Sequence, residues 1–149
     1  MIEQLKLDFN KMTEIHDKIG FNYRMTNVSA AIGCAQLERL EEFLSRKRIL
    51  ASRYAEAFSD VNGVQFFEEP IECRSNYWLN IILLDEAWQN QRDLVLKRLN
   101  EAGLMSRPAW KPLSNLSPYR NCPRMDLSVA ESLYRRLISI PSNPSLTAL

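Results

Sequence analysis

The chain is poor in the residues that build compact catalytic and metal-binding motifs. Of its 149 residues, one is histidine, three are cysteine and four are glycine. A single histidine cannot form a multi-histidine metal centre, and the cysteines are too far apart for a CxxC metal site or a disulfide framework. Four scattered glycines form neither a GxGxxG nor a GxxxxGK[ST] phosphate loop. We therefore expect no metal ion, no dinucleotide-binding fold, and reduced, partly buried thiols at Cys34, Cys73 and Cys122.

Long hydrophobic runs and an excess of charge of either sign are also missing. No apolar stretch approaches the roughly 18 residues that a membrane-spanning helix needs, and the N-terminus lacks the basic and apolar regions of a signal peptide. The 19 Lys and Arg residues balance 18 Asp and Glu residues, so no overall field attracts nucleic acid or an anionic membrane. The sequence thus predicts a soluble, cytoplasmic protein that binds neither nucleic acid nor a membrane.

The longest regular feature is a predicted helix over residues 26–58. Thr26 and Asn27 are both suitable N-caps, and after them apolar residues recur at steps of three and four without a proline. A helix of about 30 residues is longer than the range typical of globular domains, so we expect it to pack on a partner domain or subunit. Its basic run, residues 46–48, is best explained as part of a solvated face.

Residues 59–149 predict one small α/β domain. Four short strands are expected, at residues 64–67, 76–84, 104–110 and 138–141. The second strand should be covered on both faces, because its apolar run is nearly continuous. Prolines prevent regular strand pairing in the loop that follows the third strand.

Two helices are expected to cover this short, mainly antiparallel sheet. One begins at Asn90 or Gln91 and is closed by Gly103, which is placed as its C′ residue. The other follows Ser128 and Glu131, which read as an S-x-x-E capping box. The predicted architecture is a small α/β domain joined to a long connecting helix.

One loop carries side chains that suit an anion. Residues 20–24 read G-F-N-Y-R, so an amide, a phenol and a guanidinium follow one another at Asn22, Tyr23 and Arg24. An arginine fork with an amide donor can bind phosphate or carboxylate, although an arginine before a helix is commonly a surface charge. The small residues of the next turns, between Ala30 and Ala35, let another backbone approach closely. No Ser or Cys forms an evident triad with a histidine, so the residue types alone assign no catalytic mechanism.

Six segments then form an ordered pattern along most of the chain: G-F-N-Y-R-M, A-A-I-G-C-A-Q-L-E-R-L, R-K-R-I-L-A-S-R-Y, N-Y-W-L-N, R-P-A-W-K-P-L and I-S-I-P-S. Together they resemble the C-terminal part of the DegT/DnrJ/StrS family of sugar aminotransferases. N-Y-W-L-N and R-P-x-W are most similar to the branch that acts on UDP-linked 4-keto-6-deoxy-N-acetylhexosamines in bacillosamine- and legionaminic-acid-type pathways.

The resemblance implies the small C-terminal domain of a fold-type I transferase that uses pyridoxal phosphate. Such an enzyme moves an amino group from glutamate to a keto nucleotide sugar, in polysaccharide biosynthesis. Its Schiff-base lysine and most of its cofactor pocket would precede this chain, because Lys6, Lys11 and Lys18 stand in no similar context. Residues 1–25 would then be the end of the large domain, residues 26–58 the interdomain helix, and the rest the small domain.

The resemblance also assigns roles to individual residues. Asn22 matches the family asparagine that reaches across a homodimer interface to the cofactor phosphate of the neighbouring subunit. Arg24 and Tyr23 are expected on the substrate side of the same site. His16 matches a family histidine whose role stays open. Ser114 stands where the family often has a histidine, which indicates a variant substrate pocket.

Two functional readings therefore stay open. In the first, the chain is the C-terminal portion of a sugar aminotransferase and is inactive by itself, with no catalytic residue of its own. In the second, it is a stand-alone dimerisation or binding module whose small-residue helix face packs on a partner.

Overall fold

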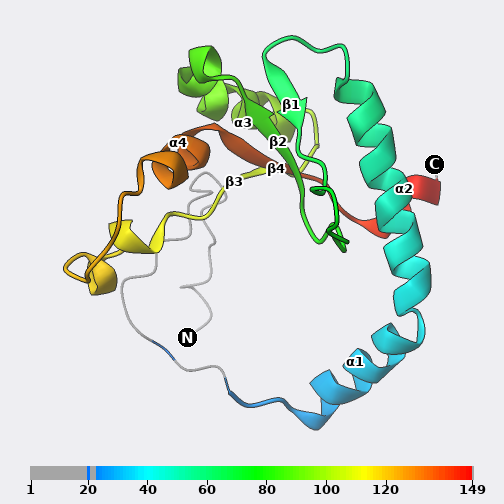
Figure 1. Cartoon of the computed structure of the whole chain (residues 1–149). Coiled ribbons are helices and arrows are strands. Elements are labelled where there is room, and N and C mark those ends of the chain that lie inside the picture. Colours follow the sequence, from blue (N-terminus) through cyan, green and yellow to red (C-terminus); the bar gives the residue numbers. More distant parts are fainter. Residues whose placement is uncertain (1–19, 21–22, 149) are drawn as a thin grey trace.

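The computed structural model describes residues 20 and 23–148 (Figure 1). The helices are α1 Asn27–Glu38, α2 Leu40–Phe58, α3 Arg92–Glu101 and α4 Ser128–Arg136. The strands are β1 Val64–Phe66, β2 Asn80–Leu84, β3 Arg107–Pro108 and β4 Leu137–Ile140. Short 3₁₀ turns occupy Glu86–Gln91, Leu113–Asn115, Ser117–Tyr119 and Pro144–Ala148. The predicted α/β class is confirmed.

The four strands form one sheet in the order β1-β2-β4-β3, and every neighbouring pair is antiparallel. The predicted antiparallel sheet is therefore confirmed. Along β2, the residues Asn80, Ile82 and Leu84 are buried, whereas Ile81 and Leu83 are only half-buried. Within the described residues, the strand is fully buried on one face and only half-buried on the other, so the prediction of equal cover on both faces is wrong.

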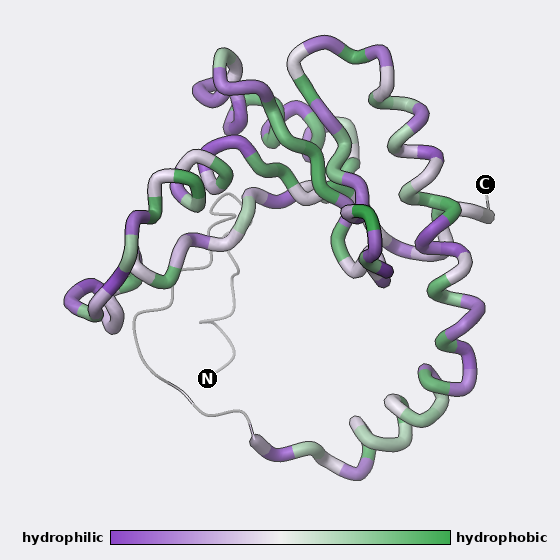
Figure 2. Tube along the Cα trace, viewed as in Figure 1, coloured by the Kyte–Doolittle hydropathy of each residue, from purple (hydrophilic) through white to green (hydrophobic). Residues whose placement is uncertain are grey.

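The core lies between that face of the sheet and the helices α2 and α3. Ala51 of α2 and Leu96 of α3 are buried against strand residues of one cluster: Phe66, Ile82, Leu84, Ile138 and Ile140. Figure 2 shows β2 and β4 as the apolar centre of this domain, while α2 alternates between apolar and hydrophilic residues. Burying each large aliphatic side chain stabilises the fold by about 1.5–3 kcal/mol.

The single helix predicted over residues 26–58 is wrong, because the chain breaks at Arg39 into α1 and α2. Thr26 is confirmed as the N-cap, since its hydroxyl accepts a hydrogen bond from the Ser29 amide at 3.2 Å. At the break, the Arg39 amide bonds to the Gln36 carbonyl and its backbone leaves helical geometry, at φ −109° and ψ 10°. No residue of α1 is buried, so no packing holds α1 in line with α2 (Figure 1).

The end of α3 follows the prediction. Gly103 adopts a φ of +79°, the left-handed conformation that glycine reaches without strain. The Gly103 amide bonds to the Asn100 carbonyl at 3.0 Å and the Leu104 amide to the Leu99 carbonyl at 2.9 Å. This pair of bonds is a Schellman motif, so Gly103 is confirmed as the C′ residue.

The start of α4 differs from the prediction. Leu127 occupies the N-cap position without a side-chain bond, so the capping box predicted at Ser128 and Glu131 is wrong. Asp126 takes the capping role instead, because its carboxylate accepts bonds from the Ser128 amide and hydroxyl at 3.3 and 2.5 Å. The two oxygens of the carboxylate accept these two bonds separately, the amide on Oδ1 and the hydroxyl on Oδ2.

Two strands are shorter than predicted. Strand β2 begins at Asn80, because the residues before it turn: Tyr77 has a φ of +45°, and the Ser75 and Asn76 side chains accept the amides of Tyr77 and Trp78. Strand β3 is reduced to Arg107–Pro108. Side chains that satisfy nearby amides offer the backbone an alternative to strand pairing.

All three cysteines lie in the described part of the chain. Cys34, Cys73 and Cys122 are free thiols, but all three are exposed, so their predicted partial burial is wrong. Among the helices of residues 20 and 23–148, none has both the length and the apolar character needed to cross a membrane. Within the same residues, no group of three or more His, Cys, Asp or Glu side chains is placed to hold a metal ion.

Candidate functional site

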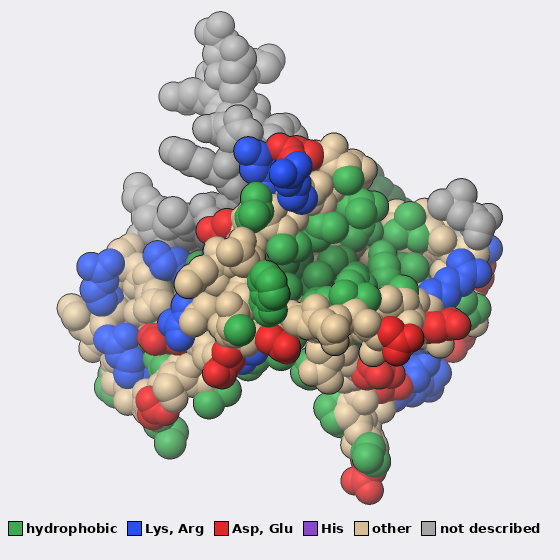
Figure 3. Space-filling model, turned by 90° about the horizontal axis from the view of Figure 1, so that it is seen from above, with side chains coloured by type: hydrophobic (Ala, Val, Ile, Leu, Met, Phe, Trp, Pro, Cys, Tyr) green, Lys and Arg blue, Asp and Glu red, His purple; other side chains and the backbone are tan. Residues whose placement is uncertain are grey.

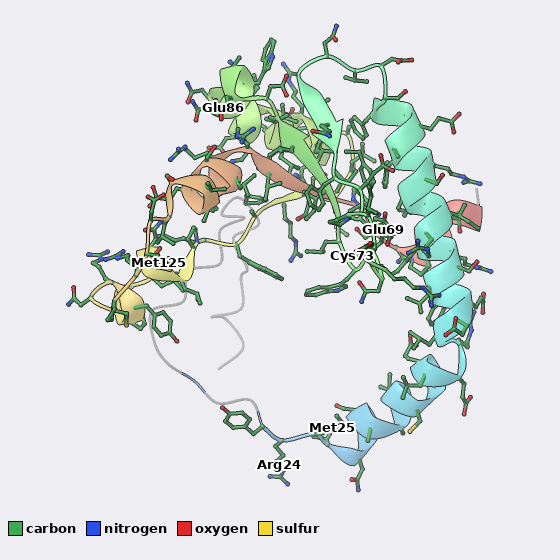
Figure 4. The ribbon with its side chains drawn as sticks, viewed as in Figure 1. Arg24, Met25, Glu69, Cys73, Glu86 and Met125 are labelled. Atoms are coloured by element: carbon green, nitrogen blue, oxygen red, sulfur yellow. The ribbon has the colours of Figure 1, made fainter. Side chains whose placement is uncertain are left out.

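The predicted anion-binding loop lies at the start of α1. Tyr23 is 91% exposed, and Arg24 is exposed beside it. Figure 4 shows the Arg24 side chain pointing away from the small domain. Asn22 and His16 lie outside the described residues. The Arg24 guanidinium is therefore accessible to a ligand or to another protein surface at this end of the chain.

Ser114 lies in a different part of the molecule. It belongs to the 3₁₀ turn Leu113–Asn115, and its hydroxyl oxygen is buried without a hydrogen-bond partner. Its carbonyl accepts a bond from the Arg124 guanidinium at 3.4 Å. The turn and the Tyr23–Arg24 segment sit at opposite ends of the arch that the chain describes (Figures 1 and 4). The structure does not bring the predicted substrate-binding residues together.

Helix α1 leaves large apolar side chains uncovered. Val28, Ile32 and Leu37 are 71, 59 and 67% exposed, and the preceding Met25 is 74% exposed. A Cβ added to Gly33 would meet no atom within 4 Å. Seen from above, the small domain also carries a broad apolar patch between charged groups (Figure 3). Apolar surfaces of this kind mark sites of contact with another protein surface.

Helix α2 holds the loop between β1 and β2 through two basic residues. Lys47 donates to the carbonyls of Tyr77, Trp78 and Ser142 at 3.2, 3.4 and 2.7 Å. These bonds use all three of its donors, and burial lowers the pKa of Lys47. The assignment of residues 46–48 to a solvated face is therefore wrong for Lys47. It is right for Arg46, which pairs with exposed Glu42 at 2.9 Å.

Arg48 makes the second contact to this loop. Its guanidinium forms a two-pronged ion pair with Glu69, and it also donates to the Ser75 carbonyl at 2.8 Å. The Glu69 carboxylate accepts the Ser75 amide at 2.6 Å. Helical spacing could have predicted the burial of Lys47. Lys47 stands four residues before the core residue Ala51, so the two side chains lie on the same face of α2.

We predict that this ion pair makes stability depend on pH. The hydrogen bond from Arg48, followed by that from the Ser75 amide, holds the pKa of Glu69 below its ordinary value. The folded state thus binds fewer protons than the unfolded state, so the contribution is complete above the unfolded pKa, about 4.3, and is lost as the pH falls below it. Denaturation midpoints measured between neutral pH and about pH 3 should fall less for Glu69→Gln than for the wild type. Asp126, whose pKa its bonds to Ser128 also lower, remains in both proteins, and equal pH dependence would contradict the prediction.

Two tryptophans form a pair that the sequence did not predict. Trp78 precedes β2 and Trp110 follows β3, yet their ring centroids lie 5.8 Å apart at an interplanar angle of 42°. Both rings are exposed, at 62 and 61%. In the strand register Asn80 lies opposite Ile140 and Pro108 opposite Ile138, so Trp78 and Trp110 leave the sheet at opposite ends of β4. The path of the chain outside the strands, and not the strand pairing, brings the two rings together.

The described residues fit only part of a pyridoxal phosphate site. Arg24 can bind a phosphate group, since its guanidinium is exposed and offers a fork of donors. Lys47 cannot serve as a Schiff-base lysine, because its three donors are committed to carbonyls. Lys97 is an exposed side chain near Glu101, at 3.8 Å, on the surface of α3. The cofactor would bring its electron-withdrawing ring, and this chain would contribute a phosphate contact.

The fold identifies the class of protein first. The small antiparallel sheet with its helices, together with the broken helix that precedes it, has the fold of part of a sugar aminotransferase: the structure of DesI with its TDP-sugar product matches 87% of this chain at a TM-score of 0.74 and 31% identity. The family profile described as the DegT/DnrJ/EryC1/StrS aminotransferase family matches residues 5–148. The chain therefore belongs to this family.

Individual relatives agree with that assignment. EpsN of Bacillus subtilis is 38% identical over 136 residues, which are 89% of this chain and 34% of EpsN. A GDP-perosamine synthase of Caulobacter vibrioides is 35% identical over 130 residues, which are 87% of this chain and 35% of that enzyme. The match to DesI likewise covers 33% of its length. The chain thus spans about a third of the length of the relatives that it matches.

Proposed function

We propose that this chain is the C-terminal portion of an aminotransferase that uses pyridoxal phosphate to move an amino group from glutamate to a keto nucleotide sugar. The observation that carries the proposal is the family match over residues 5–148 combined with a span of about a third of the relatives. Residues 1–25 then end the large domain, residues 26–58 connect the two domains, and residues 59–149 are the small domain.

The substrate follows from what the relatives' names have in common. The names of four of them contain a 4-amino-4,6-dideoxy sugar or a 4-dehydro sugar, carried on dTDP or UDP. We therefore place the reacting carbonyl at C4 of the hexose. The relatives named for UDP-linked altrosamine are 24 and 25% identical, below the GDP-perosamine synthases at 34 to 37%. These identities give the UDP-linked branch less support than the GDP-linked one, whereas the C4 position rests on the sugar names.

The site is shared between two subunits in this proposal. Arg24, with Asn22 and Tyr23, faces the cofactor of a neighbouring large domain, and the exposed apolar side chains of α1 pack on that neighbour in a homodimer. Three exposed free cysteines suit the reducing cytoplasm, where we expect the protein to act.

We expect the chain alone to be inactive and the polypeptide that also contains a large domain to be active. The chain alone should show no visible absorbance from bound pyridoxal phosphate and no amination of a 4-keto nucleotide sugar with glutamate. In the active polypeptide, Arg24→Gln should lower kcat/KM by about 10- to 150-fold, the effect of losing one charged hydrogen bond. The control is Arg39→Gln, which removes an exposed arginine that pairs with Glu42 and stacks over Phe43. Amination by the chain alone, or equal activity of the two variants, would contradict the proposal.

A second candidate function is a stand-alone dimerisation module. The uncovered apolar side chains of α1 favour it, because they suit close packing on a partner. Sedimentation of the isolated chain tests this candidate, because a monomer at high concentration argues against the module. Amination of a 4-keto nucleotide sugar by the polypeptide that also contains a large domain favours the first candidate instead.

A further inference from the structure

The exposed Trp78–Trp110 pair is held in place by its surroundings. Lys47 donates to the Trp78 carbonyl, and the Asn76 side chain accepts the Trp78 amide at 2.9 Å. Trp110 follows Arg107–Pro108, which is paired with β4. Large rings that are fixed by the backbone and yet remain about 60% exposed lose little conformational freedom when a ligand covers them.

The segment that carries Trp110 is strongly basic. Residues 107–124 contain Arg107, Lys111, Arg120 and Arg124 and no acidic residue. Arg124 is committed to the Arg120 and Ser114 carbonyls and shapes the loop. Lys111 directly follows the tryptophan in the sequence, and Arg120 belongs to the same loop. Aromatic faces next to cationic groups are the combination by which proteins hold a nucleotide: stacking for the base and ion pairing for the phosphates.

We infer that Trp110, supported by Trp78 and by the basic loop 107–124, binds the nucleotide diphosphate part of the nucleotide sugar. This inference rests on the proposed function and assigns a place to its substrate. The base lies on the outer face of the Trp110 ring, because a centroid distance of 5.8 Å leaves no room for a base between the two rings, given that a stacked base occupies roughly 3.4 Å. Stacking tolerates any base, in keeping with relatives that are named for UDP, GDP and dTDP sugars.

A protein surface is the competing occupant of the pair. The cores of protein interfaces are depleted of lysine, whereas Lys111 directly follows Trp110 and lies half-buried. A diphosphate gains from this charge and a purely apolar partner does not. The local chemistry therefore favours the nucleotide.

Calorimetric titration of the 149-residue chain with UDP, GDP and dTDP tests the inference directly. Trp110→Leu should weaken binding of all three by about 5- to 150-fold, the range expected for one base–aromatic contact. The chain offers a matched control, because Trp88 is its third tryptophan, is 53% exposed, and lies against Gly63. Trp88→Phe should bind as the wild type does. Lys111→Gln and Arg120→Gln should weaken UDP binding but leave uridine binding unchanged.

Several outcomes would overturn the inference. They are no heat of binding at millimolar nucleotide, equal affinity of Trp110→Leu and the wild type, or an equal loss in Trp88→Phe. Circular dichroism spectra of the variants confirm that each is folded. In the active polypeptide, Trp110→Leu should raise KM and leave kcat unchanged, as expected for an interaction made equally in the ground and transition states.

The same experiments keep this inference separate from the proposed function. If the active polypeptide aminates a nucleotide sugar and Trp110→Leu leaves its KM unchanged, the nucleotide site is overturned and the proposed reaction stands. If nucleotide binding depends on Trp110 but the polypeptide aminates no nucleotide sugar, the proposed reaction is overturned and the nucleotide site stands.

Discussion

Replacing Ile138 with alanine is expected to destabilise the small domain by about 2 to 5 kcal/mol. Ile138 is the most deeply buried large side chain among the described residues, with 0% of its surface exposed. It lies in β4, opposite Ile82 of β2 on one side and Pro108 of β3 on the other. Its loss removes apolar contacts and leaves a cavity that two flanking strands cannot close.

The magnitude matters because domains of this size are stable by only about 5–15 kcal/mol. Urea denaturation should show a lower midpoint with an unchanged slope. The matched control is Ile71→Ala, since Ile71 is 94% exposed in the loop before β2, and its loss should change the unfolding free energy by less than about 0.5 kcal/mol. Similar midpoints for the two variants would contradict the assignment of Ile138 to the core.

Much of this core could be predicted from the sequence because its signals are local. Branched and aromatic residues indicated strands at 76–84 and 138–141, and the structure forms them at 80–84 and 137–140. Gly103 marked the end of α3 through its freedom to take a positive φ. These features depend on a few neighbouring residues. They therefore survive when nothing is known of the rest of the fold.

The errors arose where a side chain bonds to something distant or to a competing neighbour. No proline or glycine marks the break at Arg39 in the sequence, and among the described residues no part of α1 is fully buried. The capping of α4 by Asp126 instead of Ser128 was a choice between two suitable residues that only the backbone path decides. Local signals cannot rank such alternatives.

The candidate site was predictable only in part, for the same reason. The G-x-N-x-R loop is a contiguous motif and could be found by reading. The Trp78–Trp110 pair joins two segments that lie outside the strands and 32 positions apart in the sequence, and no spacing rule connects such positions. Ser114 was assigned from a resemblance, and the structure leaves it apart from Arg24, so a shared pocket would need a second subunit.

The second large effect is expected at Lys47, whose replacement by methionine should destabilise the domain by about 1.5 to 3 kcal/mol. Methionine keeps the apolar stem but removes the donors that reach the carbonyls of Tyr77, Trp78 and Ser142. Those carbonyls belong to the loop before β2 and to the segment after β4, so both should loosen from α2. Chemical denaturation measures the loss, and near-ultraviolet circular dichroism reports the change in the tryptophan pair.

Lys97→Met is the matched control, because it makes the same substitution on the exposed surface of α3, where Lys97 has only a 3.8 Å contact with Glu101. Such exposed pairs contribute about 0 to 1 kcal/mol. If the Trp78 loop depends on Lys47, then Lys47→Met should also weaken UDP binding, whereas Lys97→Met should not. Unchanged stability in Lys47→Met would mean that water replaces its three bonds without cost. In that case the packing of Tyr54 and Phe66, and not the charged contact, would hold this end of the sheet on α2.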